Sequence, residues 1–177
     1  HQKYFIDLAY RIHQRYRDQK QRGARFLLAD GVGLGKTLQL GAVAKLIALR
    51  DDLPVLVIAP KPLVPQWQDE LSSKLAVPSA RWESGFWITE LDEEHPFAFQ
   101  GNKKTGCPRR VAIVPTSIIT SATNSETNRE LRDRLLASNF ACVIWDEAHK
   151  VRRKNLQPAR VYRSPEKNTL YAFALGI

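Results

Sequence analysis

The chain has 177 residues, 44% of them apolar, which is enough for one globular domain with a substantial core. Lys and Arg number 27 against 18 Asp and Glu, and the net charge of +9 favours a polyanionic partner such as nucleic acid, although a solubilising surface gives the same balance. Two distant cysteines and the lack of a signal-peptide pattern or of a ~20-residue apolar stretch exclude disulfide-rich secreted and transmembrane proteins.

The predicted elements alternate between helix and strand along the chain. Helices are predicted for the amphipathic stretch Phe5–Tyr16, the apolar stretch Thr37–Leu49, the stretch beginning at Pro65, and the stretch that Thr127 and Glu130 cap. Short buried strands are predicted at Arg25–Ala29, Val55–Ala59, Val111–Val114 and Ala141–Trp145. This order predicts an α/β fold with a central parallel sheet and helices on both faces. The segment Ala80–Pro108, rich in Gly and Pro, breaks the rhythm and is predicted to be an irregular insertion or a hairpin.

A glycine-rich loop joins the first predicted strand to the second predicted helix, where residues 27–39 read LLADGVGLGKTLQ. Gly31, Gly33 and Gly35 allow successive backbone N–H groups to turn toward a phosphate at the positive end of a helix. Lys36 then reaches the β- and γ-phosphates of a nucleotide, and the Thr37 hydroxyl holds Mg²⁺. A glycine-rich turn without this role would not require Gly-Lys-Thr, so the sequence favours a P-loop.

An acidic pair, Asp146 and Glu147, follows the last predicted strand. The carboxyl ends of parallel strands are where open α/β sheets bind ligands. There Asp146 is placed to hold Mg²⁺ and Glu147 to activate the attacking water. Such a pair alone is typical of a solvated loop, but together with the P-loop it indicates a nucleotide hydrolase.

These motifs resemble those of superfamily-two helicases, and more narrowly those of Swi/Snf-type DNA translocases. The matching segments are ADGVGLGKTLQ at Ala29–Gln39, VLVIAPKPLVPQWQDEL at Val55–Leu71 and WDEAHKVRRKN, with its DEAH box, at Trp145–Asn155. The Leu-Ala-Asp prefix of that branch explains why Asp30 stands where the strict P-loop has its first Gly. Gly31 departs from the branch, which usually has an acidic residue there.

The resemblance implies roles for further residues. Gln2 reads the adenine edge, Leu34 and Leu38 complete the nucleotide loop, and His149 links nucleotide state to the rest of the motor. Nucleic-acid contacts are implied for Lys61, Thr116, Ser117, Arg152 and Arg153. Other interpretations remain open, because Thr116 and Ser117 also suit a plain strand-end turn and the arginines a solvated loop. The spacing of Trp67 with Leu71 and Leu75 favours a core position over base stacking.

The predicted function is that residues 1–177 form the first RecA-like lobe of a DNA-stimulated ATPase that binds ATP and Mg²⁺ and moves along duplex DNA. The second lobe, with its arginines, has no match after Asn155, so the chain is expected to be part of a longer cytoplasmic or nucleoid protein and to hydrolyse ATP poorly alone. Alternatives are the motor lobe of a restriction-type or strand-separating helicase, a non-catalytic nucleic-acid-binding module with a relict nucleotide site, and a small-molecule kinase. A kinase would not explain the DEAH box.

Overall fold

The computed structural model describes residues 2–18, 25–29, 34–97, 105–120, 125–148 and 169–176. Its centre is a six-stranded sheet in the order β4-β3-β2-β5-β1-β6. The strands are β1 (Val55–Ala59), β2 (Ser79–Glu83), β3 (Phe86–Thr89), β4 (Glu94–Pro96), β5 (Val111–Pro115) and β6 (Cys142–Trp145). The helices are α1 (Gln2–Asp18), α2 (Lys36–Arg50), η1 (Lys61–Leu63), α3 (Val64–Leu75), α4 (Ser117–Thr120), α5 (Glu126–Leu136) and α6 (Thr169–Gly176).

Strand β1 lies inside the sheet and is buried along its whole length. It pairs in parallel with β5, Val57 facing Ile113, and with β6, Val57 facing Ile144. A five-residue apolar run between two prolines predicted this strand with the correct bounds, because a strand covered on both faces has no polar alternation.

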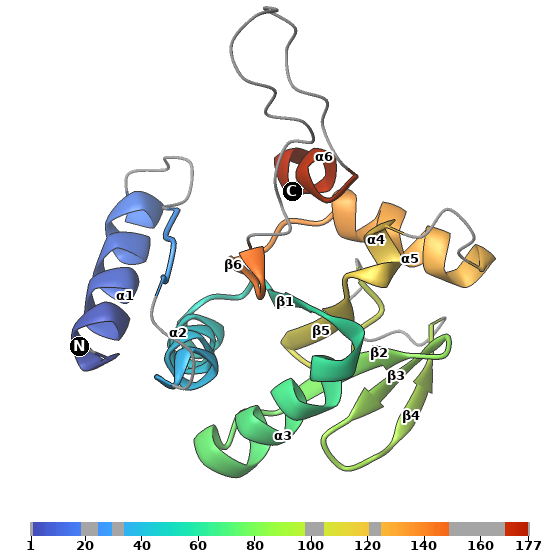
Figure 1. Ribbon diagram of the computed structural model, residues 1–177, viewed down its shortest axis with the longest axis horizontal. Helices are drawn as coiled ribbons and strands as arrows, with labels where there is room; N and C mark the ends of the chain where they lie inside the picture. The colour runs from blue at the N-terminus through green and yellow to red at the C-terminus, as the bar shows by residue number, and fades with distance from the viewer. Residues whose placement is uncertain are drawn as a thin grey trace, which may run out of the picture.

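Helices cover both faces of the sheet (Figure 1). Along β1 the side chains alternate, so Val55 and Val57 pack with α2 and α3 while Leu56 and Ile58 pack with α4, α5 and α6. Helix α1 packs mainly on α2 and contributes the buried Ala9 to the same side. The predicted α/β fold class, a central sheet with helices on both faces, is confirmed.

The sheet is mixed rather than wholly parallel. Strands β2 and β3 form an antiparallel hairpin whose two-residue turn, Ser84 and Gly85, has positive φ angles of 50° and 94°. Strand β2 joins the parallel part beside β5, and β4 extends the sheet beyond β3. Trp82 and Trp87 of the hairpin are 2% and 0% exposed and stack edge to face, 5.1 Å apart. Residues 79–97 therefore continue the sheet and form part of its core.

The strand expected at Arg25–Ala29 is absent, and this prediction was wrong. These residues form no ladder with any described strand, and Leu27 is 79% exposed. Phe26 instead lies edge to face with Phe5 of α1, at 6.3 Å. A short apolar run predicts burial but cannot by itself specify a pairing partner.

The cap predicted for α5 was also misplaced. Ser125, not Thr127, is the N-cap, and its hydroxyl accepts a hydrogen bond from the Asn128 backbone N–H at 3.3 Å. Ser at this position begins the helix two residues earlier than the Thr127 and Glu130 pair would. Helix α3 begins with Pro65 in its first turn as expected, and Trp67 and Leu71 on its buried face are each 1% exposed.

Glu90 links the β2–β3 hairpin to Arg109, which lies just before β5. Its carboxylate accepts hydrogen bonds from Arg109 Nε at 2.9 and 3.0 Å and from the Ser79 backbone N–H at 3.1 Å. Burial alone raises the pKa of Glu90, but the Arg109 guanidinium and the backbone donors outweigh it and lower the pKa below its usual value. The same ion pair raises the pKa of Arg109.

Replacing Glu90 by Gln is expected to lower the free energy of unfolding near pH 7 by about 1–3 kcal/mol, the scale of hydrogen bonds to a charged group. Because the folded-state pKa of Glu90 is lowered, this contribution is present above the unfolded-state value of 4.5 and is lost as pH falls through the folded-state value. Urea denaturation at a series of pH values checks this. The exposed Glu94, changed to Gln, is the control and should alter stability by under about 0.5 kcal/mol.

Two further observations concern the class of protein. Cys107 and Cys142 are free thiols, and burial raises the pKa of each to about 12, so neither is poised as a nucleophile. Across the described ranges, no helix is both long and apolar enough to cross a bilayer.

Candidate functional site

Three segments singled out by their sequence follow neighbouring strands at one edge of the sheet. Lys61 comes just after β1, Thr116 directly after β5, and Asp146 directly after β6. The backbone N–H of Thr116 donates to the Ala59 carbonyl at 2.8 Å, and that of Asp146 donates to the Ile58 carbonyl at 2.9 Å. Parallel pairing therefore places the starts of all three segments side by side at the carboxyl end of the sheet.

The N-terminus of α2 points toward the same edge. Only residues 51–54 connect α2 to β1, so the helix runs back along the strand and its first turn lies at the strand's carboxyl end. Lys36, Thr37 and Leu38 form that first turn, and each is half-buried. The turn contains no acidic residue, which leaves the positive end of the helix dipole uncompensated by a carboxylate on the helix itself.

Gly35 is the N-cap of α2, and two features require a glycine there. Its φ is 73°, in the left-handed region that disfavours residues with a Cβ. A Cβ at this position would also lie 3.0 Å from Nε2 of Gln2. The loop therefore passes close to the start of α1 at the point where it enters the helix.

Gln2 and Gln39 both bind the end of the glycine-rich loop. The Leu34 carbonyl accepts a hydrogen bond from Gln2 Nε2 at 2.7 Å and another from Gln39 Nε2 at 3.3 Å. Gln39 is 1% exposed, whereas Gln2 is exposed. Two amides from two helices thus fix the carbonyl that precedes Gly35, and Gln2 lies beside the loop.

The acidic pair at the end of β6 has a defined local geometry. The Asp146 carboxylate accepts the Glu147 backbone N–H through Oδ1 at 2.9 Å and the Trp67 indole N–H through Oδ2 at 2.8 Å. Asp146 is half-buried and Glu147 is exposed. Glu147 has a φ of 53°, so its backbone is left-handed and its side chain leaves the turn in a direction that a continuing strand would not give.

The other candidate residues fall into two groups. Lys61, in η1, is exposed, and Thr116 and Ser117 are half-buried where β5 leads into α4. The Thr116 carbonyl accepts two backbone hydrogen bonds that start α4, so these residues do form a strand-end turn. The remaining candidates, Gly31, Gly33, His149, Arg152 and Arg153, lie outside the described residues.

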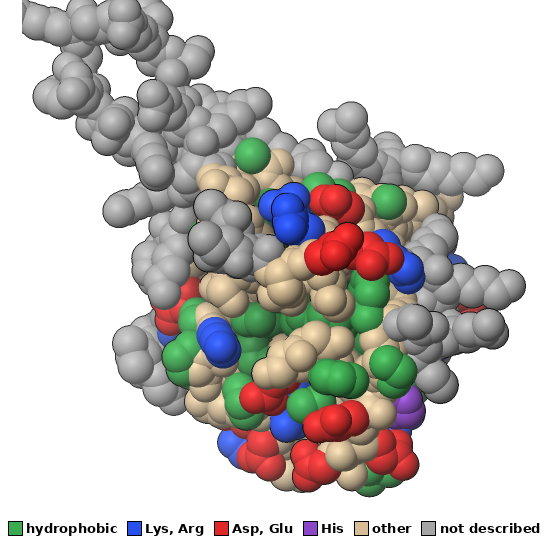
Figure 2. Space-filling view, turned by 90° about the vertical axis from the view of Figure 1, so that its right-hand side faces the viewer, with side chains coloured by type: hydrophobic (Ala, Val, Ile, Leu, Met, Phe, Trp, Pro, Cys, Tyr) green, Lys and Arg blue, Asp and Glu red, His purple; other side chains and the backbone are tan. Residues whose placement is uncertain are grey.

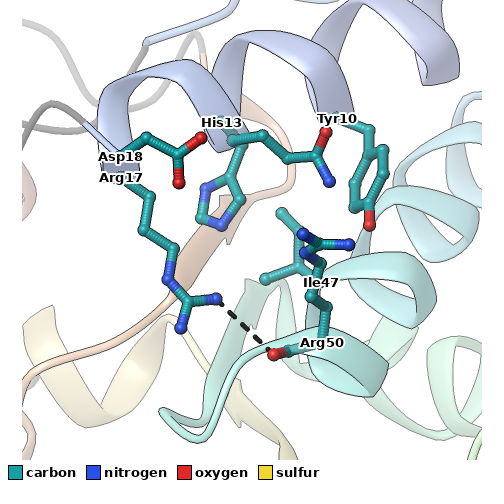
Figure 3. A pocket seen from close by; sticks show the side chains of 7 residues that line it. Tyr10, His13, Arg17, Asp18, Ile47 and Arg50 are labelled. Carbon is teal, nitrogen blue, oxygen red and sulfur yellow. Dashed lines mark hydrogen bonds between the residues drawn. The ribbon is translucent and has the colours of Figure 1, made fainter.

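A pocket of about 360 Å³ lies between α1 and α2 (Figure 3). His13 and Arg17 from α1 and Arg50 from α2 line it, and Arg17 donates to the Arg50 carbonyl at 3.5 Å. The pocket adjoins the C-terminal end of α2, and the 15-residue helix is about 22 Å long. It is therefore separate from the site at the helix N-terminus.

The chain matches the SNF2-related domain family over residues 1–167. This chain belongs to that family. It is 26% identical to human "DNA annealing helicase and endonuclease ZRANB3" in a match that covers 80% of this chain and 11% of the relative. It is also 26% identical to Bacillus subtilis "Uncharacterized ATP-dependent helicase YqhH", over 84% of this chain and 22% of the relative. It is 25% identical to Yersinia pestis "RNA polymerase-associated protein RapA", over 88% of this chain and 15% of the relative. The chain thus spans less than a quarter of the length of each.

Membership of the SNF2-related family confirms the resemblance inferred from the three sequence motifs. The family match covers both the glycine-rich loop and the acidic pair, and it continues through the hairpin at residues 79–97. The hairpin is therefore included in the match to the SNF2-related domain.

Two polar side chains of this SNF2-related domain were missed as site residues. Gln39 is one of the few polar residues in the middle of a mainly apolar helix, and its placement there was the available signal. Trp67 was correctly predicted to be in the core, but its hydrogen bond to Asp146 spans 79 positions along the chain. Helical spacing predicts that Trp67 lies on the buried face of its helix, but it gives no information on the hydrogen-bond partner of the indole N–H.

The donor set of this SNF2-related domain fits a nucleotide with Mg²⁺. A helix N-terminus carrying Lys36 and Thr37 suits phosphate, and the left-handed φ of 73° at Gly35 turns the backbone into that helix. Mg²⁺ prefers oxygen ligands and usually takes one or two from protein, the rest coming from phosphates and water. A hydroxyl from Thr37 and a carboxylate from Asp146 match that preference.

Proposed function

We propose that this SNF2-related domain is the ATP-binding lobe of a DNA-stimulated translocase that hydrolyses ATP to move along duplex DNA. The observation that carries the proposal is the convergence at one sheet edge of the Lys36 and Thr37 helix N-terminus with the Asp146 and Glu147 turn. The same edge carries Lys61 and Thr116, for which the proposal assigns contacts with DNA phosphates. Nucleotide and DNA would thus meet at the ends of adjacent strands.

Each residue at the edge has a proposed task. Lys36 neutralises the β- and γ-phosphates of ATP, and Thr37 with Asp146 holds Mg²⁺, which supplies charge stabilisation to the phosphates when bound. Glu147 orients and deprotonates the attacking water. Gln2, already beside the loop, reads the adenine edge, and the proposal keeps Gly31, Gly33, Leu34, Leu38 and His149 as further nucleotide contacts.

The charge distribution supports DNA binding away from the hairpin. Residues 79–97 contain five acidic residues against one Arg, and Figure 2 shows Asp and Glu side chains gathered over the face that includes the hairpin. The acidic hairpin repels a phosphate backbone, and the positive excess of the chain lies outside residues 79–97. We propose Lys61, Thr116, Ser117, Arg152 and Arg153 as the DNA-contacting set.

A complete motor requires a second RecA-like lobe, which we propose is supplied by the same polypeptide. Arginines from such a lobe act on the transferring phosphate, an effect on the order of 10³–10⁵ in rate for arginine fingers. A motor on duplex DNA would work in the bacterial cytoplasm or nucleoid. A strand-separating helicase is the second candidate, because the relative YqhH is described as an ATP-dependent helicase. An unwinding assay beside an ATPase assay distinguishes the two.

The test of nucleotide binding is Lys36→Ala in the 177-residue chain. Loss of the charge-assisted contact to phosphate is expected to weaken Mg·ATP binding by roughly 1–3 kcal/mol, measured by titration of a fluorescent ATP analogue. Lys74→Ala is the matched control, because Lys74 is an exposed lysine on α3 that pairs with Glu70, and it should leave affinity unchanged. Equal affinity in the Lys36 variant and the wild type would contradict the assigned role.

A further inference from the structure

Trp67 and Asp146 form a contact that packing alone does not explain. Trp67 lies in α3 with 1% of its surface exposed, and its indole N–H donates to Asp146 Oδ2 at 2.8 Å. Buried indole N–H groups commonly find a hydrogen-bond partner, and any backbone carbonyl would serve, but those of Trp87 and Trp145 are buried without one among the described residues. For Trp67 the partner is the carboxylate of the acidic pair that follows β6.

The hydrogen bond from Trp67 is one of two that fix the orientation of the Asp146 carboxylate. Oδ1 of Asp146 accepts the Glu147 N–H at 2.9 Å, and the Asp146 backbone N–H is anchored to the Ile58 carbonyl of β1 at 2.9 Å. The carboxyl torsion of an aspartate is soft and broadly distributed when it has no such partners. With one donor on each oxygen, the plane of the carboxylate is set before any ligand arrives, and each oxygen retains a lone pair.

We propose that Trp67 is a positioning residue that orients the Asp146 carboxylate toward the divalent cation of the nucleotide. The inference rests on the proposed function. Indole N–H is a donor only, so Trp67 cannot ligate a cation and acts on it solely through Asp146. Partners that orient a metal ligand typically change metal affinity by 10–100-fold when they are removed.

The first test uses Trp67→Phe, which keeps an aromatic ring in the core and removes the donor. Binding of ADP to the 177-residue chain is measured by calorimetry with Mg²⁺ and with EDTA, and the ratio of the two affinities gives the gain from the metal. Trp67→Phe is expected to reduce this gain by about 10–100-fold while leaving the affinity for ADP in EDTA unchanged.

Trp82→Phe is the matched control for this test. Trp82 is 2% exposed and donates its indole N–H to Asn128 Oδ1 at 2.9 Å, in the core on the opposite face of the sheet. The Trp82→Phe variant loses an indole N–H, as Trp67→Phe does, but at a position that does not contact the site. Its Mg²⁺-dependent gain in ADP affinity should therefore match that of the wild type. An unchanged Mg²⁺-dependent gain in ADP affinity in Trp67→Phe would mean that Trp67 serves only core packing, and it would overturn the inference. A wild-type chain with no metal-dependent gain would overturn the proposed function as well.

A second measurement does not require the Trp67 variant to fold. In the wild-type chain labelled with ¹⁵N-tryptophan, the Trp67 indole resonance is assigned by elimination from single Phe substitutions of the other three tryptophans. It is expected to shift when Mg·ADP is added and to shift in Asp146→Asn, whereas the Trp82 resonance stays in place. If the Trp67 resonance stays in place both on addition of Mg·ADP and in Asp146→Asn, the indole N–H is not coupled to the carboxylate and the inference is wrong.

Discussion

Glu147→Gln is expected to lower DNA-stimulated ATP turnover by on the order of 10²–10⁴-fold in a two-lobed protein that carries this chain, the range for a lost general base. Affinity for ATP should stay within about threefold, which is under ~1 kcal/mol. The amide keeps the shape and hydrogen-bonding capacity of the side chain and removes only its basicity. Steady-state hydrolysis with saturating duplex DNA, together with nucleotide titration, measures both quantities.

Asp146→Asn provides the informative contrast, since Asp146 is proposed to hold the metal. That variant should lose Mg²⁺-dependent binding and turnover together, whereas Glu147→Gln should lose turnover alone. Glu126→Gln, an exposed acid in the first turn of α5, controls for a general change in surface charge. Near-normal hydrolysis by the Glu147 variant would show that the acidic pair is not the catalytic box.

Trp87→Ala is expected to lower the free energy of unfolding by about 3–5 kcal/mol, the range for truncating a buried aromatic side chain. Trp87 is 0% exposed in β3 and packs on Trp82, so its loss leaves a cavity between the hairpin and α5. Denaturation by urea, followed by far-ultraviolet circular dichroism, gives the value directly.

The neighbouring residue supplies the control for the hairpin. Phe86 lies in the same strand, points to the opposite face and is 40% exposed, so Phe86→Ala should cost under about 1 kcal/mol. Similar small losses for both variants would mean that residues 79–97 form a surface appendage rather than part of the core.

Elements with continuous apolar runs between clear breaks could be predicted closely from the sequence. The bounds of β1 were predicted correctly because Pro54 and Pro60 flank VLVIA, and β5 differed by one residue. The hairpin was harder because Arg81, Trp82 and Phe86 give neither clean alternation nor a continuous apolar run. Its partner, β5, follows nearly thirty residues after β2, and no local pattern contains that pairing.

The candidate site could be predicted in its sequence motifs but not in its supporting contacts. Lys36 and Asp146 belong to patterns whose chemistry constrains residue type and spacing. The supporting residues, Gln39 at the Leu34 carbonyl and Trp67 at Asp146, make tertiary contacts that any donor of similar size and burial can provide. The wrongly predicted strand at 25–29 shows the same limit, because its composition suits a strand but it pairs with none of the strands in the part of the chain that the structure describes.

The left-handed backbone of Glu147 has a consequence for how such lobes evolve. An L-residue held near a φ of 53° is disfavoured by roughly 1–2 kcal/mol per residue, a penalty that glycine avoids. A lobe that did not need this side chain would gain stability by exchanging it for Gly or Asn. If Glu147 has the proposed catalytic role, relatives that keep Glu at this conformationally unfavourable position are expected to hydrolyse nucleotide, whereas relatives with Gly or Asn there are expected to bind it without hydrolysis.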